Sequence, residues 1–121
     1  MLTLAGAVAA TTAACSSSHP TASAAATSSA ATRGQDCTDV SDVLSDGPDP
    51  SADAVGYAQA QILPLKQLAL GDDAALRTAV DRLDTAFGTF VGADGSARAQ
   101  SAAQVTSAEN ALNVLCPGVA P

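Results

Sequence analysis

The chain has 121 residues, of which 47% are hydrophobic but only 2% aromatic, and this length allows one small domain at most. Twelve acidic residues against five basic ones disfavour nucleic acid as a partner, because affinity for phosphates comes from clustered lysines and arginines. One histidine and three cysteines form no motif for catalysis or metal binding, so we expect neither an enzyme nor a bound cofactor or metal.

The first element is an uncharged stretch of small and apolar residues from Leu2 to Ala14. It is too short to cross a bilayer as a helix, which takes about 20 residues. It has the length of the apolar core of an export signal, and the small side chains of Ala13 and Ala14 suit a signal peptidase. We therefore expect residues 1–14 to be a signal peptide.

The sequence around Cys15 carries a family resemblance. Residues 12–15, Thr-Ala-Ala-Cys, followed by three serines, resemble the lipobox and the mature start of bacterial lipoproteins. The resemblance implies that Cys15 becomes diacylglyceryl-modified and anchors the chain on the extracytoplasmic face of the membrane, as its first mature residue. Two departures are Thr12, where leucine is usual, and the absence of Lys or Arg before the apolar stretch, which suggests a start further upstream.

Two alternatives to the lipid anchor remain at this point. One is a soluble secreted form that is cut near Ala14 or Ala26, and the other is a chain that is not cleaved or not exported. Acyl chains contribute about 0.8 kcal/mol per buried CH₂, so two or three of them would hold even this acidic domain on a membrane.

Residues 16–35 consist mainly of serine, alanine and threonine, with one proline and no large apolar side chain. Such a segment buries too little surface to offset chain entropy, so we expect residues 15–35 to form a lipidated, disordered tether with a reach of roughly 25 Å. His19 is interpreted as a solvated residue of this spacer. Attachment of O-linked sugars is the alternative role for so many hydroxyl groups.

From Asp36 onward, apolar residues recur with a helical period near 3.5, and nothing alternates as strands do. The pattern predicts long helices over residues 52–70, 73–92 and 96–115, and a short one over residues 38–45. Asp49 or Ser51, Asp72 or Asp73, and Ser96 are the expected caps of the long helices. The expected fold is all-α: a small antiparallel bundle of three long helices and one short N-terminal helix over residues 36–117, with 118–121 as a tail.

Cysteine parity predicts one disulfide. Matched helices joined by short loops return Cys116 to the end of the bundle where Cys37 begins, and lipid occupies Cys15. Closing the 79-residue separation between Cys37 and Cys116 should contribute about 4 kcal/mol to stability. The alternative, a pair of free redox thiols, lacks the CxxC spacing that such chemistry favours.

Two groups of carboxylates are candidates for chemistry. Five aspartates in and around the loop at 46–51 could bind Ca²⁺, but their spacing matches no EF-hand, and a solvated face with helix capping is the simpler interpretation. They are Asp39, Asp42, Asp46, Asp49 and Asp53. Asp81 and Asp84 lie on one helix face and could form an acid–base pair, whereas the spacing of Asp73, Arg77 and Asp81 is ordinary support for an exposed helix surface.

Pro64 lies inside the predicted helix 52–70 and removes a backbone hydrogen bond to Ala60. A kink there could open a groove beside Tyr57, Ile62 and Leu65, or simply bend or divide the helix. Gly88 and Gly92 have GxxxG spacing, which in a soluble helix permits close packing more often than dimerisation. The alanine-rich interior argues against a lipid-sized cavity.

The full layout resembles the small lipoproteins of high-G+C Gram-positive bacteria, in which a Ser/Thr/Ala-rich tether precedes an Ala/Asp-rich helical domain bracketed by two cysteines. The resemblance implies a location more than an activity. We therefore expect a lipid-anchored, non-enzymatic module that binds or scaffolds other proteins of the cell envelope. The alternative is a carrier of a small ligand with a cleft near Pro64, and the sequence leaves the oligomeric state open.

Overall fold

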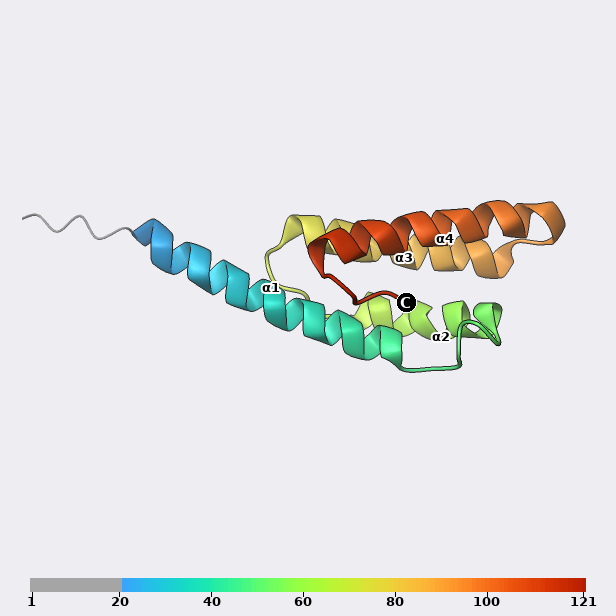
Figure 1. The fold of residues 1–121 in the computed structure, drawn as a ribbon, viewed down its shortest axis with the longest axis horizontal. Coiled ribbons are helices and arrows are strands. Elements are labelled where there is room, and N and C mark those ends of the chain that lie inside the picture. The colour runs from blue at the N-terminus through green and yellow to red at the C-terminus, as the bar shows by residue number, and fades with distance from the viewer. Residues whose placement is uncertain (1–20) are drawn as a thin grey trace, which may run out of the picture.

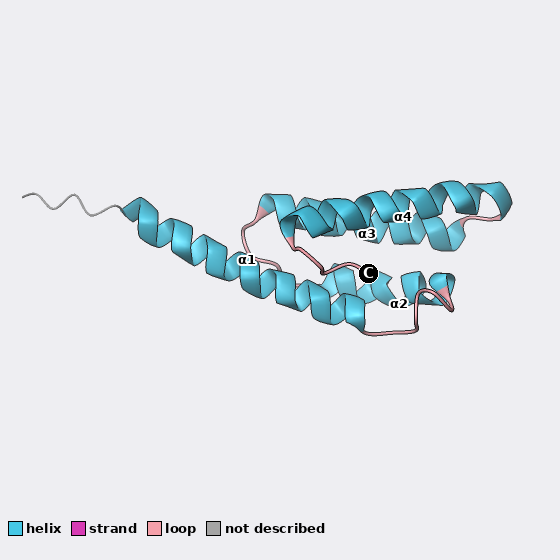
Figure 2. Ribbon diagram, viewed as in Figure 1, coloured by secondary structure: helices cyan, strands magenta, loops and turns pink. Residues whose placement is uncertain are grey.

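A computed structural model describes residues 21–121, with side chains described from Ala30 onward. This part of the chain contains four helices and no strand (Figure 2). They are α1 (Thr21–Ser45), α2 (Ala54–Gln67), α3 (Ala74–Gly92) and α4 (Gly95–Leu115). The prediction of an all-α fold is confirmed over this range. The expected signal peptide, the lipidation of Cys15 and the role of His19 lie outside the described residues.

Helix α1 is the main difference from the predicted elements. It has 25 residues and begins at Thr21, so residues 21–35 are helical where we expected a disordered tether, and the short helix expected over 38–45 is the end of a long one. Six alanines between Thr21 and Thr32 explain the difference, because alanine is the strongest helix former and our prediction considered only burial. The N-terminal half of α1 projects away from the other helices (Figure 1).

Helix α2 is shorter than predicted, with 14 residues instead of the expected span 52–70. Asp53 caps its N-terminus by accepting a hydrogen bond from the amide of Gly56 at 2.8 Å. Pro64 has no amide to donate to Ala60, and the helix ends at Gln67, within one turn of the proline. The three long helices are therefore α1, α3 and α4, and the short one is α2.

Helices α3 and α4 lie close to their predicted positions. Asp73 caps α3 and accepts a hydrogen bond from the amide of Leu76 at 3.0 Å, as its place before the apolar run predicted. Helix α4 begins at Gly95, and its N-cap is Asp94 instead of Ser96. The predicted close packing of Gly88 and Gly92 is wrong, since a Cβ atom added at either position would have no neighbour within 4 Å.

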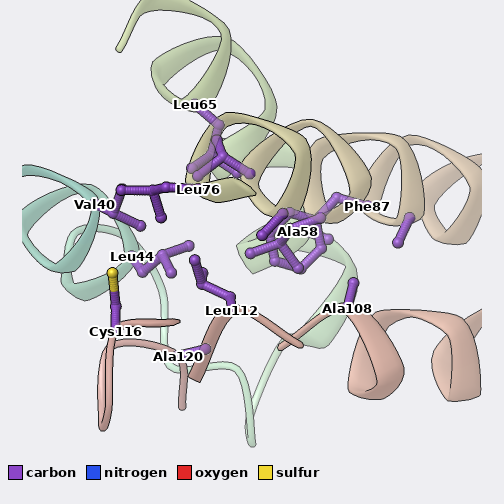
Figure 3. Close-up of a cluster of buried hydrophobic side chains, with 14 of the residues drawn as sticks. Val40, Leu44, Ala58, Leu65, Leu76, Phe87, Ala108, Leu112, Cys116 and Ala120 are labelled. Carbon is purple, nitrogen blue, oxygen red and sulfur yellow. The ribbon is translucent and has the colours of Figure 1, made fainter. Parts of the chain in front are cut away.

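Helix α3 supplies more residues to the core than any other helix. It packs against α2 on one side and α4 on the other, and α3 and α4 lie side by side in Figure 1. Its Leu76, Leu83 and Phe87 are almost completely buried. Figure 3 shows Val40 and Leu44 of α1 in the same cluster. The apolar spacing on α3 therefore predicted the side of the helix that the fold buries.

The C-terminal half of α1 is fastened to the rest of the domain. Cys37 and Cys116 form a disulfide with their Cα atoms 5.5 Å apart, which confirms the predicted pairing. The buried Asp36 accepts a hydrogen bond from the amide of Gly71 at 3.0 Å. A Cβ atom at Gly71 would lie 2.7 Å from Cγ2 of Thr32, so a larger residue at this close approach of α1 to the loop before α3 would displace the Thr32 side chain.

Residues 118–121 are packed against the domain, although we expected a tail. Asn113 of α4 accepts a hydrogen bond from the amide of Ala120 at 3.0 Å and donates one to its carbonyl oxygen at 3.3 Å. Ala120 is buried in consequence. The turn that makes this return possible contains Gly118, whose φ of 77° favours glycine.

Candidate functional site

Three of the five aspartates considered for calcium hold local structure. The carboxylate of Asp49 accepts hydrogen bonds from the hydroxyl of Ser51 at 2.7 Å and from its amide at 2.8 Å, and these bonds lower the pKa of Asp49. Asp53 caps α2, and Asp39 accepts a hydrogen bond from Gln35 at 2.8 Å. Within residues 21–121, no three His, Cys, Asp or Glu side chains are grouped so as to hold a metal ion.

Asp81 and Asp84 have different surroundings. Asp81 is exposed, whereas the Asp84 side chain is only 15% exposed, and its Oδ2 lies 3.8 Å from Nζ of Lys66 on α2. Its other oxygen, Oδ1, is buried without a hydrogen-bond partner. Asp84 therefore forms an ion pair that joins α2 to α3. Because Asp81 is exposed and Asp84 is largely buried, the two carboxylates do not share one site, and the structure gives no support to an acid–base pair.

A large groove lies beside the disulfide. It has a volume of about 1020 Å³ and is formed by α1, the start of α3 and the residues that follow α4. Its lining includes Ala30, Arg33, Cys37, Ala74, Pro117 and Val119. The side chains of Arg33 and Asp73 form an ion pair on its wall. The hydrogen bond from the Leu76 amide, followed by the one from Arg33, lowers the pKa of Asp73.

A smaller cavity of about 160 Å³ lies between α2, α3 and α4, with Pro50 at its edge. Three aromatic side chains line it, together with small apolar residues and two polar ones. The lining residues are Pro50, Ala54, Tyr57, Ala58, Phe87, Phe90, Ala102, Val105, Thr106 and Glu109. The rings of Tyr57 and Phe87 meet edge to face, with their centroids 5.9 Å apart.

Glu109 gives this cavity its charge. It is the only glutamate of the chain, is half-buried, and burial raises the pKa of its carboxyl. The hydroxyl of Tyr57 donates a hydrogen bond to the carbonyl oxygen of Leu44 at 2.8 Å. Burial, followed by the negative charge of Glu109, raises the pKa of Tyr57 to about 12. The cavity therefore combines aromatic walls with one carboxyl group.

The sequence pointed to part of this cavity and missed its charged member. Tyr57 was expected beside a groove, but Pro64, Ile62 and Leu65 line neither this cavity nor the groove at the disulfide. Leu65 is buried in the core instead. Glu109 had a recognisable signal, because it follows Val105 by four residues and therefore shares its apolar helix face.

No helix within residues 21–121 is both long enough and apolar enough to span a membrane. Comparisons with protein-family models, with curated proteins and with solved structures found no match.

Proposed function

We propose that the chain is a lipid-anchored module on the extracytoplasmic face of the cytoplasmic membrane, which binds another envelope protein and catalyses no reaction. The observation that carries this proposal is the disulfide between Cys37 and Cys116. Disulfides persist in oxidising compartments, which fits an exported chain. The pairing leaves Cys15, directly after the apolar stretch 2–14, as the one cysteine outside it.

The groove beside the disulfide is the surface that we assign to the protein partner. Its volume of about 1020 Å³ is at the upper end of the range for small-molecule sites, and its lining mixes apolar residues with the ion pair of Arg33 and Asp73. Residues 30–37 of α1 form one wall, and the same helix extends toward Cys15. We also propose that consecutive helices of the domain run antiparallel, which brings both disulfide cysteines to one end of the bundle.

Labelling and crosslinking in the same cells test the proposal. Radiolabelled palmitate should enter the wild-type protein and be absent from Cys15→Ser, which should leave the membrane fraction. Crosslinking should capture a partner with the wild type and lose it with Ala74→Arg, which places a bulky charge in the groove. Ala75→Arg is the matched control, because Ala75 is also exposed in the first turn of α3 but does not line the groove.

Each half of the experiment has a contradicting result. Wild-type protein that takes up no palmitate and stays in the cytosol would overturn the anchor, whereas release into the medium would favour the secreted alternative. Equal capture of the partner by both arginine variants would show that the groove is not the binding surface. Circular dichroism of the purified variants establishes that both are folded.

A further inference from the structure

We propose that the cavity between Tyr57 and Glu109 binds a small organic ammonium ion, with the Glu109 carboxylate as its counter-ion and aromatic rings as its walls. The site goes beyond the proposed function, since neither the lipid anchor nor the groove at the disulfide takes part in it. Its ligand is identified by three properties of the cavity: size, charge and lining.

The size of the cavity limits the ligand. An apolar cavity of about 150 Å³ can hold a molecule as large as benzene, and this one has about 160 Å³. Alanines at 54, 58 and 102 leave that space between three helices, where larger side chains would fill it. A ligand with about six or seven non-hydrogen atoms therefore fits.

The charge of the cavity selects a cation. Among the described residues, the ion pairs join Arg33 to Asp73, Lys66 to Asp84 and Arg98 to Asp94, so none of them includes Glu109. No hydrogen bond to its carboxylate is found within residues 30–121 either. A half-buried carboxylate without a cation is unfavourable, and a bound ammonium would supply the missing charge.

The net charge of −7 works in the same direction, because it raises the local concentration of small cations around the protein. Arg77 and Arg82, the two basic residues outside the ion pairs, are exposed on α3 and do not line the cavity. Among the residues that the structure describes, no lysine, arginine or histidine side chain lines the cavity.

The aromatic lining suits an ammonium that carries a hydrocarbon group. Aromatic faces attract organic cations, and they also accept apolar groups. The hydroxyl of Tyr57 already donates to Leu44, so this residue contributes its ring. Phe90 already has the guanidinium of Arg98 5.8 Å from its ring centre, which shows a cation held against one of these rings within the fold.

The fluorescence of Tyr57 provides a direct measurement, because it is the only tyrosine and the chain has no tryptophan. The full chain with its disulfide formed is titrated with cyclohexylammonium and, separately, with cyclohexanol, a neutral probe of the same shape. We expect a saturable change with cyclohexylammonium and at least tenfold weaker binding of cyclohexanol. Equal binding of the two probes, or no saturable change with either, would overturn the proposal without any variant.

Three variants then locate the site. Glu109→Gln should weaken the binding of cyclohexylammonium at least tenfold and leave cyclohexanol unaffected. Asp42→Asn removes the same charge from an exposed position on α1 and should bind like the wild type, which separates the local carboxylate from the net charge. Ala102→Leu fills the cavity and should abolish binding of both probes.

Two results with these variants would contradict the site. Tight binding of cyclohexylammonium to Glu109→Gln would exclude the carboxylate as the counter-ion. An equal loss with Asp42→Asn would show a general attraction of cations by the acidic surface. Thermal melting of each variant establishes that it is folded, and the contrast between the two probes in the wild type remains decisive in any case.

Discussion

Glu109 shows how one residue couples stability to pH. Burial raises the pKa of its carboxyl in the folded state above the ordinary value of 4.5, so the folded protein holds this proton more tightly than the unfolded chain. Below the ordinary pKa, the group is protonated in both states and costs nothing. As the pH rises through the raised pKa, ionisation of the half-buried group destabilises the fold.

We therefore expect Glu109→Gln to raise the melting temperature by a few degrees at pH 7 and to leave it almost unchanged at pH 3. The glutamine amide is neutral at both pH values. At pH 7 it replaces an ionised carboxylate, whereas at pH 3 it replaces a protonated, neutral carboxyl. Thermal unfolding followed by circular dichroism at both pH values measures the difference. A gain of the same size at pH 3 would show that the charge is not its cause.

Among the elements, α2 depends most on its first turn. It has only 14 residues and contains Pro64, so it forms fewer backbone hydrogen bonds than α3 or α4. Asp53 caps it through the amide of Gly56. Gly56 is needed for this arrangement, since a Cβ atom there would collide with the carboxylate of Asp53.

Asp53→Ala should lower the free energy of unfolding by about 1 kcal/mol, the usual contribution of an N-cap. The melting temperature should fall by about 4 to 8 °C in a domain of this size. Asp53→Asn is the matched control, because asparagine retains an acceptor oxygen and should preserve most of the stability. Equal losses in the two variants would mean that the charge, and not the cap, stabilises α2.

At the scale of the whole molecule, the disulfide is the covalent link between α1 and the end of α4. Replacing both cysteines in Cys37→Ser/Cys116→Ser should lower the free energy of unfolding by about 4 kcal/mol, because the unfolded chain regains the freedom of a 79-residue loop. Urea unfolding measures this loss, and the reduced wild type should behave like the double variant. A loss below about 1 kcal/mol would contradict this chain-entropy account of the disulfide.

Helices α3 and α4 could be predicted to within two residues because their signals are local. Leu76, Leu83 and Phe87 repeat at helical spacing, and Asp73 stands where an N-cap belongs. Helix α1 could also have been found from its alanines, but the prediction assumed that a segment without large apolar residues stays unfolded. Alanine lowers the cost of forming a helix without any burial, so that assumption failed for residues 21–35.

The packing of residues 118–121 could not be predicted in this way. Ala120 is held by Asn113, and nothing in the sequence indicates that these two residues meet. The same applies to Gly71, which lies close to Thr32 only because of where α1 is placed. Contacts of this kind depend on the positions of whole helices, which local patterns do not determine.

The sequence by itself determined the all-α class, the ends of α3 and the pairing of Cys37 with Cys116, because helical period, capping and cysteine number act locally or by simple parity. Only the tertiary structure decided that Tyr57, Phe90 and Glu109 share one cavity. They come from three different helices, and whether their side chains meet depends on the rotation and separation of those helices. Long-range packing sets both quantities, and no short stretch of sequence encodes them.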